Sequence, residues 1–573
     1  MTTDELSGAL SLTTVIRDHA RRSPARPAVA RVAGSSRAGD VSWWTYGDLD
    51  EHARRVGSRL QRHGSSGERV LLFYPSGPDF VAAFVGCLYV GMVAVPAPVP
   101  SGQQHDLRRV KAIAENSGAT LVLTDEENLA AVTHWAASVL PHAIVTATDR
   151  LEGAPDDCHV ISTDRAQIAM LQYTSGSTAD PKGVVLSHGN LLSNAAAIAR
   201  SLGLDEKTRF GGWIPNYHDM GLIGLIILPL LLGGCTALMR PASFVKRPHL
   251  WLEMMDDLGI HLTAAPNFAF DLCRRRITDE QMDGIDLSNW KYAINGSEPV
   301  RPEVLAAFSQ RFATAGFRAD AMVPCYGLAE TTLFVSGTPH RPPVVRQVDA
   351  DELQKHRFVP ATNPSAAREV VSCGAVHECD VQVVDPDTLA VLDAGKIGEI
   401  CLSGASVSSG YWDNPAASAA TFGLRIGDSD EKFMRTGDLG VVHDGEVYVT
   451  GRIKEVIIIR GRNLYPQDIE HELRAHHHEL DAGVGAVFSV PGEESVVVTH
   501  EIKGSLDEDE LARVAHGVRQ TVVREFGVGV LEVALLRPGA VRRTTSGKVE
   551  RAAMRELFVR RDLEALHRDR ETL

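Results

Sequence analysis

Two kinds of apolar pattern alternate over the first hundred residues, and this alternation constrains the fold more than any other feature. Residues 48–62 repeat apolar side chains with the period of a helix: Leu49, Ala53, Val56 and Leu60. Residues 68–74 have the pattern of a buried strand, with a continuous apolar run at 70–74, and 79–91 and 93–96 repeat the helix and the strand. Helices between successive buried strands favour parallel pairing with both sheet faces covered. The sequence therefore predicts an α/β fold.

The length of 573 residues corresponds to two to five structural units of ordinary size. From residue 447 the pattern changes to short strands and helices in alternation. We expect an α/β large N-terminal domain of several lobes with mainly parallel sheets over residues 1–453, and a small mobile α+β C-terminal domain over 454–573. Residues 339–368 are rich in proline, arginine and acids, and we interpret them as an insertion or a mobile surface segment.

One stretch, residues 220–239, holds twenty residues without a charge, which is long enough to span a bilayer. It contains Pro229, however, and the Gly233-Gly234 pair divides it into a helix-like half and a strand-like half. We therefore expect a buried core element and no stable membrane span.

Composition excludes several classes of protein. There are 58 Lys plus Arg residues and 73 Asp plus Glu residues, so the formal net charge is −15. An acidic chain repels phosphate backbones on average, and we expect no nucleic-acid partner. The eight cysteines include no CxxC pair, which disfavours a zinc ribbon, and the first residues lack the pattern of a signal peptide. These features favour reduced thiols and a cytoplasmic location.

The strongest local signal for chemistry is the segment 173–183, YTSGSTADPKG, directly after an apolar strand. Its hydroxyls, loop amides and two glycines can surround phosphate oxygens, and Lys182 supplies a positive charge. It does not have the Walker spacing, which disfavours a P-loop kinase or ATPase. Taken alone, the segment is equally consistent with an ordinary polar turn between strand and helix.

This segment resembles the phosphate loop of adenylate-forming enzymes, the superfamily of acyl-CoA synthetases, peptide-synthetase adenylation domains, luciferases and fatty acyl-AMP ligases. Six further motifs continue the resemblance in the order found in that superfamily: WIPNYHDMGLIG (213–224), NGSEPV (295–300), YGLAETT (326–332), RTGDLG (435–440), GRIKEV (451–456) and RTTSGKVER (543–551). The resemblance covers nearly the whole chain and implies ATP as substrate and Mg²⁺ as cofactor.

The resemblance implies a reaction in which a carboxylate attacks the α-phosphate of ATP, giving an acyl-adenylate and pyrophosphate. Charge develops on phosphoryl oxygens in that transition state, so cations are needed there. Lys548 matches the catalytic lysine, Glu330 the glutamate that holds Mg²⁺, and His218 a position beside the acyl carboxylate. Outside this context Lys548 would be an ordinary surface lysine and His218 an ordinary loop histidine.

The remaining motif residues are implied to bind ATP, apart from one hinge. Tyr326, Gly327, Gly296 and Ser297 would border the adenine, and Asp438 and Arg452 the ribose. The phosphate loop would contribute six residues: Thr174, Ser175, Gly176, Ser177, Thr178 and Lys182. Lys454 matches the hinge about which the small domain rotates. The adjacent residues His476–His478 cannot all face one metal ion on a helix, so we expect a solvated face.

Within the superfamily, several segments resemble the fatty acyl-AMP ligase branch: NYHDMGLIG, AAPNFAFDLC (264–273), GRNLYPQDIE (461–470) and the insertion at 339–368. The branch implies that a fatty acid is activated and loaded onto the phosphopantetheine of a holo acyl carrier protein in trans. Apolar residues such as Leu222, Phe268 and Phe270 would line the acyl pocket or belong to the core. The alternatives are a fatty or aryl acyl-CoA ligase of the same superfamily and a non-catalytic scaffold that binds nucleotide.

Overall fold

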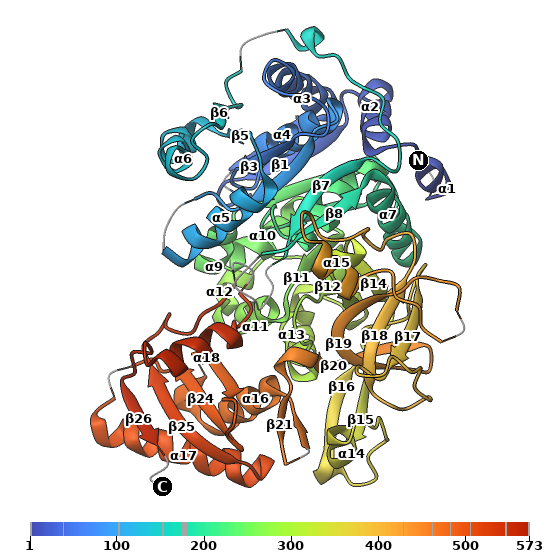
Figure 1. Cartoon of the computed structure of the whole chain (residues 1–573). Helices are drawn as coiled ribbons and strands as arrows, with labels where there is room; N and C mark the ends of the chain where they lie inside the picture. Colours follow the sequence, from blue (N-terminus) through green and yellow to red (C-terminus); the bar gives the residue numbers. More distant parts are fainter. Residues whose placement is uncertain are drawn as a thin grey trace.

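A large body and a smaller C-terminal body make up the molecule (Figure 1). The structure, a computed structural model, describes residues 3–37, 39–100, 104–151, 154–174, 181–427, 429–460, 462–481, 483–504, 506–544 and 547–570. The chain from blue to orange forms the large body, and the red end forms a separate sheet with its own helices. The mainly parallel sheets of the large body confirm the predicted fold class.

The first sheet has the strand order β6-β5-β3-β4-β7-β8, and all neighbours are parallel except β7 and β8. Its strands are β3 (Arg69–Phe73), β4 (Val93–Ala97), β5 (Leu121–Thr124), β6 (Ile144–Ala147), β7 (Ile168–Tyr173) and β8 (Gly183–Ser187). The accompanying helices are α3 (Tyr46–Gln61), α4 (Pro78–Tyr89), α5 (Gln104–Ser117) and α6 (Glu126–Val139). Helix α3 begins with a capping box and buries the four apolar residues of the predicted face.

The second sheet has the order β14-β13-β12-β11-β9-β10-β1-β2, with parallel inner strands and an antiparallel strand at each edge. Its strands are β1 (Pro27–Val32), β2 (Val41–Thr45), β9 (Arg209–Gly212), β10 (Cys235–Met239), β11 (Leu262–Ala265), β12 (Tyr292–Asn295), β13 (Met322–Gly327) and β14 (Phe334–Gly337). The helices of this part of the chain are α1 (Thr3–Gly8), α2 (Leu12–Arg22), α7 (His188–Leu202), α8 (Leu228–Leu232), α9 (Pro241–Lys246), α10 (His249–Asp257), α11 (Asn267–Arg276), α12 (Asp279–Met282) and α13 (Pro302–Phe312).

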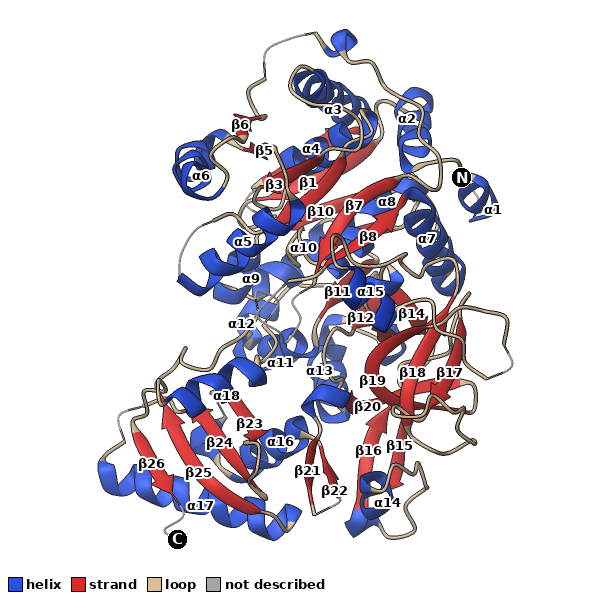
Figure 2. Cartoon of the chain, in the orientation of Figure 1, coloured by secondary structure: helices blue, strands red, loops and turns tan. Residues whose placement is uncertain are grey.

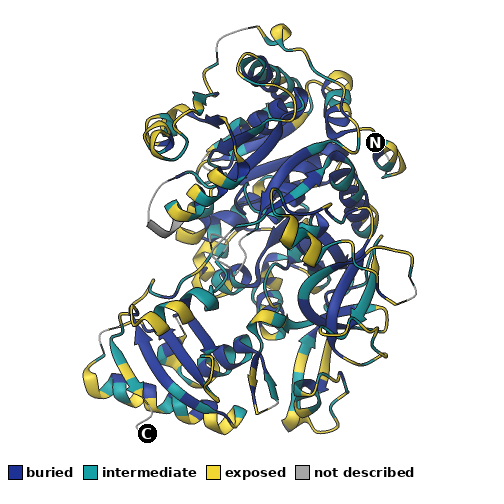
Figure 3. Cartoon of the chain, in the orientation of Figure 1, coloured by how far each residue is buried: buried dark blue, intermediate teal, exposed yellow. Residues whose placement is uncertain are grey.

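The uncharged run 220–239 is core, as predicted. It forms a π-helix (Met220–Ile227), continues as α8, turns at Gly233 with a positive φ of 77°, and ends as the inner strand β10. Nearly all of its residues are buried within the sheet-and-helix layers (Figure 3). Among the described residues, no helix combines the length and the apolar character needed to cross a bilayer.

A third sheet is antiparallel, with the order β17-β18-β19-β20 (Figure 2). It consists of β17 (Asp380–Val384), β18 (Gly398–Ser403), β19 (Met434–His443) and β20 (Glu446–Arg452), and α15 (Pro415–Thr421) lies between β18 and β19 in sequence. Strand β19 carries the RTGDLG motif, and Asp438 of this motif bonds to Tyr326 of β13 in the second sheet.

Residues 339–368, interpreted as an insertion or a mobile surface segment, contain regular elements and buried side chains. They contain β15 (Val345–Asp349) and α14 (Ala350–Gln354), and β15 pairs antiparallel with β16 (Ala367–Val371). Val348, Leu353 and Phe358 are buried in a cluster with residues of β19 and β20. The few apolar side chains are separated by prolines and charges, so no helix or strand period was visible, yet long-range packing orders the segment.

The C-terminal body is built on the sheet β23-β24-β25-β26. Its strands are β23 (Gly485–Ser489), β24 (Ser495–Glu501), β25 (Gly529–Leu536) and β26 (His567–Arg570), and its helices are α16 (Pro466–His476), α17 (Glu508–Phe526) and α18 (Arg551–Arg560). The hairpin of β21 (Ile457–Ile459) and β22 (Arg462–Leu464) precedes it. Two apolar clusters of its own lie on the faces of this sheet, which is the α+β character expected for this part of the chain.

Candidate active site

The phosphate-loop segment joins β7 to β8, and its two ends are closed on each other. The N–H of Thr174 donates to the carbonyl of Lys182 at 3.2 Å. The predicted binding residues Ser175, Gly176, Ser177 and Thr178 lie outside the described residues. The Lys182 ammonium lies 4.6 Å from the centroid of the Tyr411 ring. Burial and the nearby Lys454 lower the pKa of Lys182, and the Glu330 carboxylate opposes this.

Glu330 lies in a single helical turn after β13 and faces the same tyrosine. The Tyr411 hydroxyl donates to Glu330 Oε1 at 2.9 Å. Burial raises the pKa of the Glu330 carboxyl above its ordinary value, and the hydrogen bond from Tyr411 opposes part of this rise. Lys182 and Glu330 are far apart in sequence, but both contact the Tyr411 side chain.

The predicted adenine-binding residues end two neighbouring parallel strands, β12 and β13. Ser297 has a φ of 73°, a left-handed conformation that is uncommon for a residue other than glycine. At Gly327 a Cβ atom would lie 1.8 Å from the carbonyl oxygen of Leu333, so only glycine fits. At Gly296 it would lie 2.9 Å from the carbonyl oxygen of Cys325. The backbone here is shaped by close approaches that side chains would prevent.

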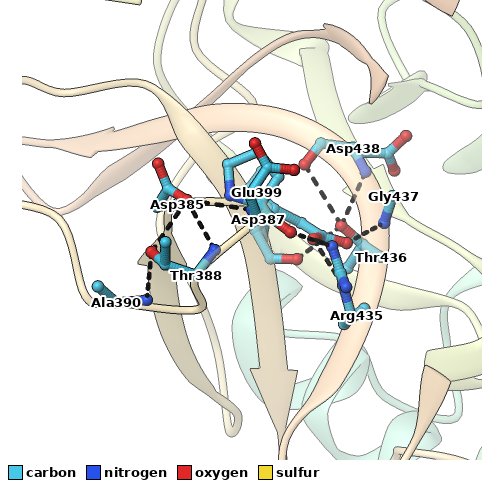
Figure 4. A network of polar contacts seen from close by, with 11 residues as sticks. Asp385, Asp387, Thr388, Ala390, Glu399, Arg435, Thr436, Gly437 and Asp438 are labelled. Atoms are coloured by element: carbon cyan, nitrogen blue, oxygen red, sulfur yellow. Dashed lines mark hydrogen bonds and ion pairs between the residues drawn. The ribbon is translucent and has the colours of Figure 1, made fainter. Parts of the chain in front are cut away.

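Asp438 is positioned by a polar network around the RTGDLG turn (Figure 4). The buried Glu399 accepts from the Arg435 side chain at 2.7 Å and from the Gly437 N–H at 3.0 Å. The Thr436 hydroxyl donates to the carbonyl of Ile400 and accepts from the Asp438 N–H. This network fixes the backbone from which the Asp438 side chain projects.

The Asp438 carboxylate is shared by two of the predicted site residues. The Tyr326 hydroxyl donates to one oxygen at 2.8 Å, and Arg452 Nε donates to the other at 2.9 Å. Asp438 in turn raises the pKa of Arg452. Tyr326 and Asp438, both buried, and the more exposed Arg452 therefore form one hydrogen-bonded cluster, although 126 residues of sequence separate the first from the last.

Lys548 enters the large body from the C-terminal body. Its turn is closed by the N–H of Thr544, which donates to the carbonyl of Lys548 at 2.8 Å. Gly547 has a φ of 89° and lies against the Phe268 ring, 3.0 Å from where its Cβ would be. Burial and Arg452 lower the pKa of Lys548. Three carboxylates from the large body oppose this shift: Asp219, Glu298 and Asp438.

His218 lies beside Asp219 at the start of the π-helix, with 2.7 Å between His218 Nδ1 and Asp219 Oδ1. Burial acts to raise the pKa of Asp219, but His218 and Lys548 lower it below its ordinary value. His218 and Lys548 thus both act on the Asp219 carboxylate. The place of His218 beside the acyl carboxylate stays a prediction.

The segment predicted as the hinge is a short helical turn, Ile453–Glu455, with an exposed Lys454. The next residue, Glu455, accepts from Arg551 Nη1 at 2.7 Å, and Arg551 also holds Glu470 with two hydrogen bonds. His476 and His478 are exposed as predicted, while His477 lies 3.0 Å from the Thr521 hydroxyl. No cluster of metal-ligating side chains occurs within the described ranges.

Comparison with known proteins decides the family. A family model described as AMP-binding enzyme matches residues 16–412, and a second, described as Disco-interacting protein 2-like, AMP domain, matches residues 454–568. The chain belongs to the AMP-binding enzyme family. Among its relatives is the medium-chain-fatty-acid–[acyl-carrier-protein] ligase JamA of Moorena producens, 38% identical over 91% of this chain and 90% of that protein.

Other relatives support the assignment of this chain to the AMP-binding enzyme family. The 4-hydroxyphenylalkanoate adenylyltransferase of Mycobacterium tuberculosis is 36% identical over 92% of this chain and 87% of its own length. A crystal structure of a fatty acid AMP ligase from Legionella pneumophila, 35% identical, covers 99% of both chains with a TM-score of 0.76. A fatty acyl-adenylate ligase structure from a study of the Escherichia coli and L. pneumophila proteins, 30% identical, gives 0.88 over 97% of this chain and 99% of the other.

Three residues of this AMP-binding enzyme join the site without having been predicted: Tyr411, Asp219 and Glu298. Glu298 Oε1 accepts from the N–H of Phe268 at 2.6 Å, and burial raises its pKa. Asp219 follows His218 and Glu298 follows Ser297, and both lie inside recognised motifs. Their position next to predicted site residues was therefore the signal that could have identified them. Tyr411 lies in SSGYW (408–412), which carries no spacing that indicates chemistry.

The Glu330 side chain of this AMP-binding enzyme suits a magnesium ion whose other ligands include phosphate oxygens of a nucleotide. One carboxylate oxygen accepts from Tyr411, which leaves the other for a hard cation. A single protein carboxylate suits Mg²⁺, because this ion keeps water and phosphate oxygens in its shell.

The predicted acyl-pocket residues separate into two groups. Leu222 and Phe270 are fully buried core residues, and Phe270 packs against Trp251, Trp290 and Phe308. Phe268 is only partly buried and lies between Gly547 and the Trp213 ring. Phe268 therefore remains the candidate pocket residue of this AMP-binding enzyme.

Proposed function

We propose that the protein activates a fatty acid with ATP and then loads the acyl group onto the phosphopantetheine thiol of a holo acyl carrier protein in trans. The observation that carries this proposal is the position of Lys548, which the C-terminal body places among Asp219, Glu298 and Asp438 of the large body. The names of the relatives support the substrate class: JamA and TtuA are medium-chain-fatty-acid–[acyl-carrier-protein] ligases.

In the first step a carboxylate oxygen attacks the α-phosphorus, the bond from this phosphorus to the bridging oxygen breaks, and pyrophosphate leaves. Lys548 would bridge the incoming carboxylate and the α-phosphate, since a mobile ammonium stabilises charge on both. Lys182 and the loop residues Thr174, Ser175, Gly176, Ser177 and Thr178 would hold the outer phosphates. Mg²⁺ held by Glu330 would neutralise phosphate charge.

The nucleoside would be held by the predicted residues at the strand ends. Tyr326, Gly327, Gly296 and Ser297 would contact the adenine. Asp438 would accept from the ribose hydroxyls, with Arg452 beside it. His218 would border the acyl carboxylate, and Phe268 the chain that follows it.

The second step requires the C-terminal body to turn. We propose residues 1–453 and 454–573 as the two domains and Lys454 as the hinge, so that rotation withdraws Lys548 and admits a thiol. Contacts from the ordered 339–368 segment support its role as an insertion that restrains this movement. Arg462 and Asn463 donate to Gln354 at 2.7 and 2.9 Å, and Arg368 forms an ion pair with Asp468.

A second candidate is a fatty acyl-CoA ligase. One relative, FadD21 of M. tuberculosis, 35% identical over 91% of this chain, is named a putative fatty-acid–CoA ligase. The restraint on the C-terminal body favours the carrier over coenzyme A as acceptor, because it limits the orientations available for thiol entry. We also propose a cytoplasmic location, which the eight free cysteines support.

The test is pyrophosphate exchange with ATP and Mg²⁺ over a panel of fatty acids of graded length and 4-hydroxyphenylalkanoates. We expect exchange with fatty acids, and acyl transfer to a holo carrier but not to coenzyme A. Lys548→Ala should slow adenylation by about 10²–10³-fold, whereas Lys503→Ala, an exposed lysine of the same body, should not. Absence of exchange with every acid would leave only the nucleotide-binding scaffold, and rapid acyl-CoA formation would favour the second candidate.

A further inference from the structure

Tyr411 contacts both of the charged side chains that face the outer phosphates in the proposed site. Its hydroxyl donates to Glu330 Oε1 at 2.9 Å, and the face of its ring lies 4.6 Å from Lys182 Nζ. Only 8% of Tyr411 is exposed. Lys182 and Glu330 are close enough for Glu330 to raise the pKa of Lys182, yet no ion pair joins them within the described part of the chain. Tyr411 is thus interposed between two opposite charges.

The backbone around Tyr411 is tied to the segments that carry both charges. The N–H of Trp412 donates to the carbonyl of Gly183, next to Lys182, at 2.7 Å. The N–H of Ser408 donates to the carbonyl of Glu330 at 2.8 Å. Residues 408–412 thus lie along β8, with an isolated antiparallel bridge between Tyr411 and Val184, and their backbone bonds link the end of the phosphate loop to the glutamate turn.

A side chain between Lys182 and Glu330 matters because, in the proposed function, the ammonium binds phosphate and the carboxylate binds Mg²⁺. A direct ion pair would use the ammonium and the carboxylate for each other and would weaken their hold on an incoming nucleotide and metal. The ring face attracts the ammonium but leaves its N–H donors available. The hydroxyl takes one lone pair of Oε1 and leaves Oε2 available.

We propose that Tyr411 is a positioning residue that keeps Glu330 available to Mg²⁺ and Lys182 available to the phosphates of ATP. This inference rests on the proposed function, because it assigns the two charges to metal and nucleotide. It predicts that the hydroxyl and the ring have separable effects: the hydroxyl acts on the metal side, and the ring acts on the phosphate side.

Two variants separate the contributions in calorimetric titrations of the whole chain with ATP, with and without Mg²⁺ and without any fatty acid. Tyr411→Phe keeps the ring, so ATP binding without Mg²⁺ should be unchanged while the Mg²⁺ concentration required rises about tenfold. Tyr411→Leu also removes the ring face, and ATP binding without Mg²⁺ should weaken about two- to fivefold.

The control is Tyr46→Phe in helix α3. This change removes a buried hydroxyl that donates to the carbonyl of Gly234 at 2.9 Å. It should leave both titrations unchanged. The proposal is overturned if Tyr411→Phe has the Mg²⁺ requirement of the unmodified protein, or if both Tyr411 variants weaken binding equally with and without the metal, since that pattern indicates packing alone. Because no fatty acid enters the titrations, a wrong assignment of the acyl substrate would leave their result intact.

Discussion

Burial shifts the two central ionisable groups of the site toward neutrality. It raises the pKa of Glu330, and together with Arg452 it lowers the pKa of Lys548. In the proposed reaction both groups act in their charged forms: the Glu330 carboxylate binds a cation, and the Lys548 ammonium is itself the cation. Each therefore loses its function at a pH closer to neutrality than an exposed residue of the same type would.

These shifts predict a narrow bell-shaped pH profile for adenylation. As the pH falls through the raised pKa of Glu330, the carboxylate is protonated and the rate falls. As the pH rises through the lowered pKa of Lys548, the ammonium is lost and the rate falls again. Pyrophosphate exchange measured across pH should show both limbs. In Lys548→Arg, which stays charged, the alkaline limb should disappear at a reduced overall rate; an unchanged alkaline limb would contradict the assignment.

At the scale of elements, one buried guanidinium joins the start of α18 to α16 and to the hinge segment. Arg551 follows the Lys548 turn by three residues and donates to Glu470 at 2.7 and 2.8 Å and to Glu455 at 2.7 Å. Glu470 also accepts from the N–H of Val487 at 3.0 Å. The turn that carries Lys548 is therefore supported by a network of largely buried charges.

Replacing Arg551 by alanine should destabilise the C-terminal body. The change leaves two largely buried carboxylates unpaired, and we expect a loss of about 3–5 kcal/mol in the free energy of unfolding measured with urea. Arg460→Ala, which breaks a highly exposed pair with Glu494, is the matched control and should change little. If the two variants unfold at the same urea concentration, the Arg551 network does not brace the turn.

At the scale of the whole molecule, the 339–368 segment joins the two bodies. Gln354 of α14 accepts from Arg462 and Asn463 in the β21–β22 hairpin, and Arg368 of β16 pairs with Asp468 of α16. These contacts link the large body to both the hairpin and the first helix of the C-terminal body. They are the physical basis for expecting restrained rotation.

Breaking the two side-chain contacts, Arg462 with Gln354 Oε1 and Arg368 with Asp468, should relax the choice of acceptor. The bond from Asn463 goes to the backbone carbonyl of Gln354 and is retained. In the double variant Gln354→Ala with Arg368→Ala, we expect the rate of acyl-CoA formation to rise severalfold while adenylation is retained. Acyl-CoA and acyl-carrier products would be separated by mass spectrometry after a common adenylation reaction. Arg346→Ala, which breaks an exposed pair between β15 and Asp444 of the β19–β20 turn, should leave the products unchanged. Equal acyl-CoA formation by all three proteins would show that the segment does not control the acceptor.

The fold class was predictable, and candidate site residues could be named, because the signals are local. Helix α3, the buried run that ends in β10 and the motif residues around Glu330, Asp438 and Lys548 each follow from a short stretch of sequence. The order of segment 339–368 was not predictable, because Val348, Leu353 and Phe358 are buried only by contacts with β19 and β20. Tyr411 was missed for the same reason, since its two partners are 81 and 229 residues away.

The sequence by itself determined which elements form and which chemical groups are available. Apolar periods specify helices and strands locally, and glycines and lysines in ordered motifs indicate phosphate chemistry. Only the tertiary structure decided which groups lie together. Asp438 bonds to Tyr326 and Arg452, Tyr411 contacts both Lys182 and Glu330, and Lys548 lies near enough to Asp219 and Glu298 for their charges to affect its pKa. The physical reason is that these contacts, and the burial that shifts the pKa values of Glu330 and Lys548, depend on the packing of distant segments.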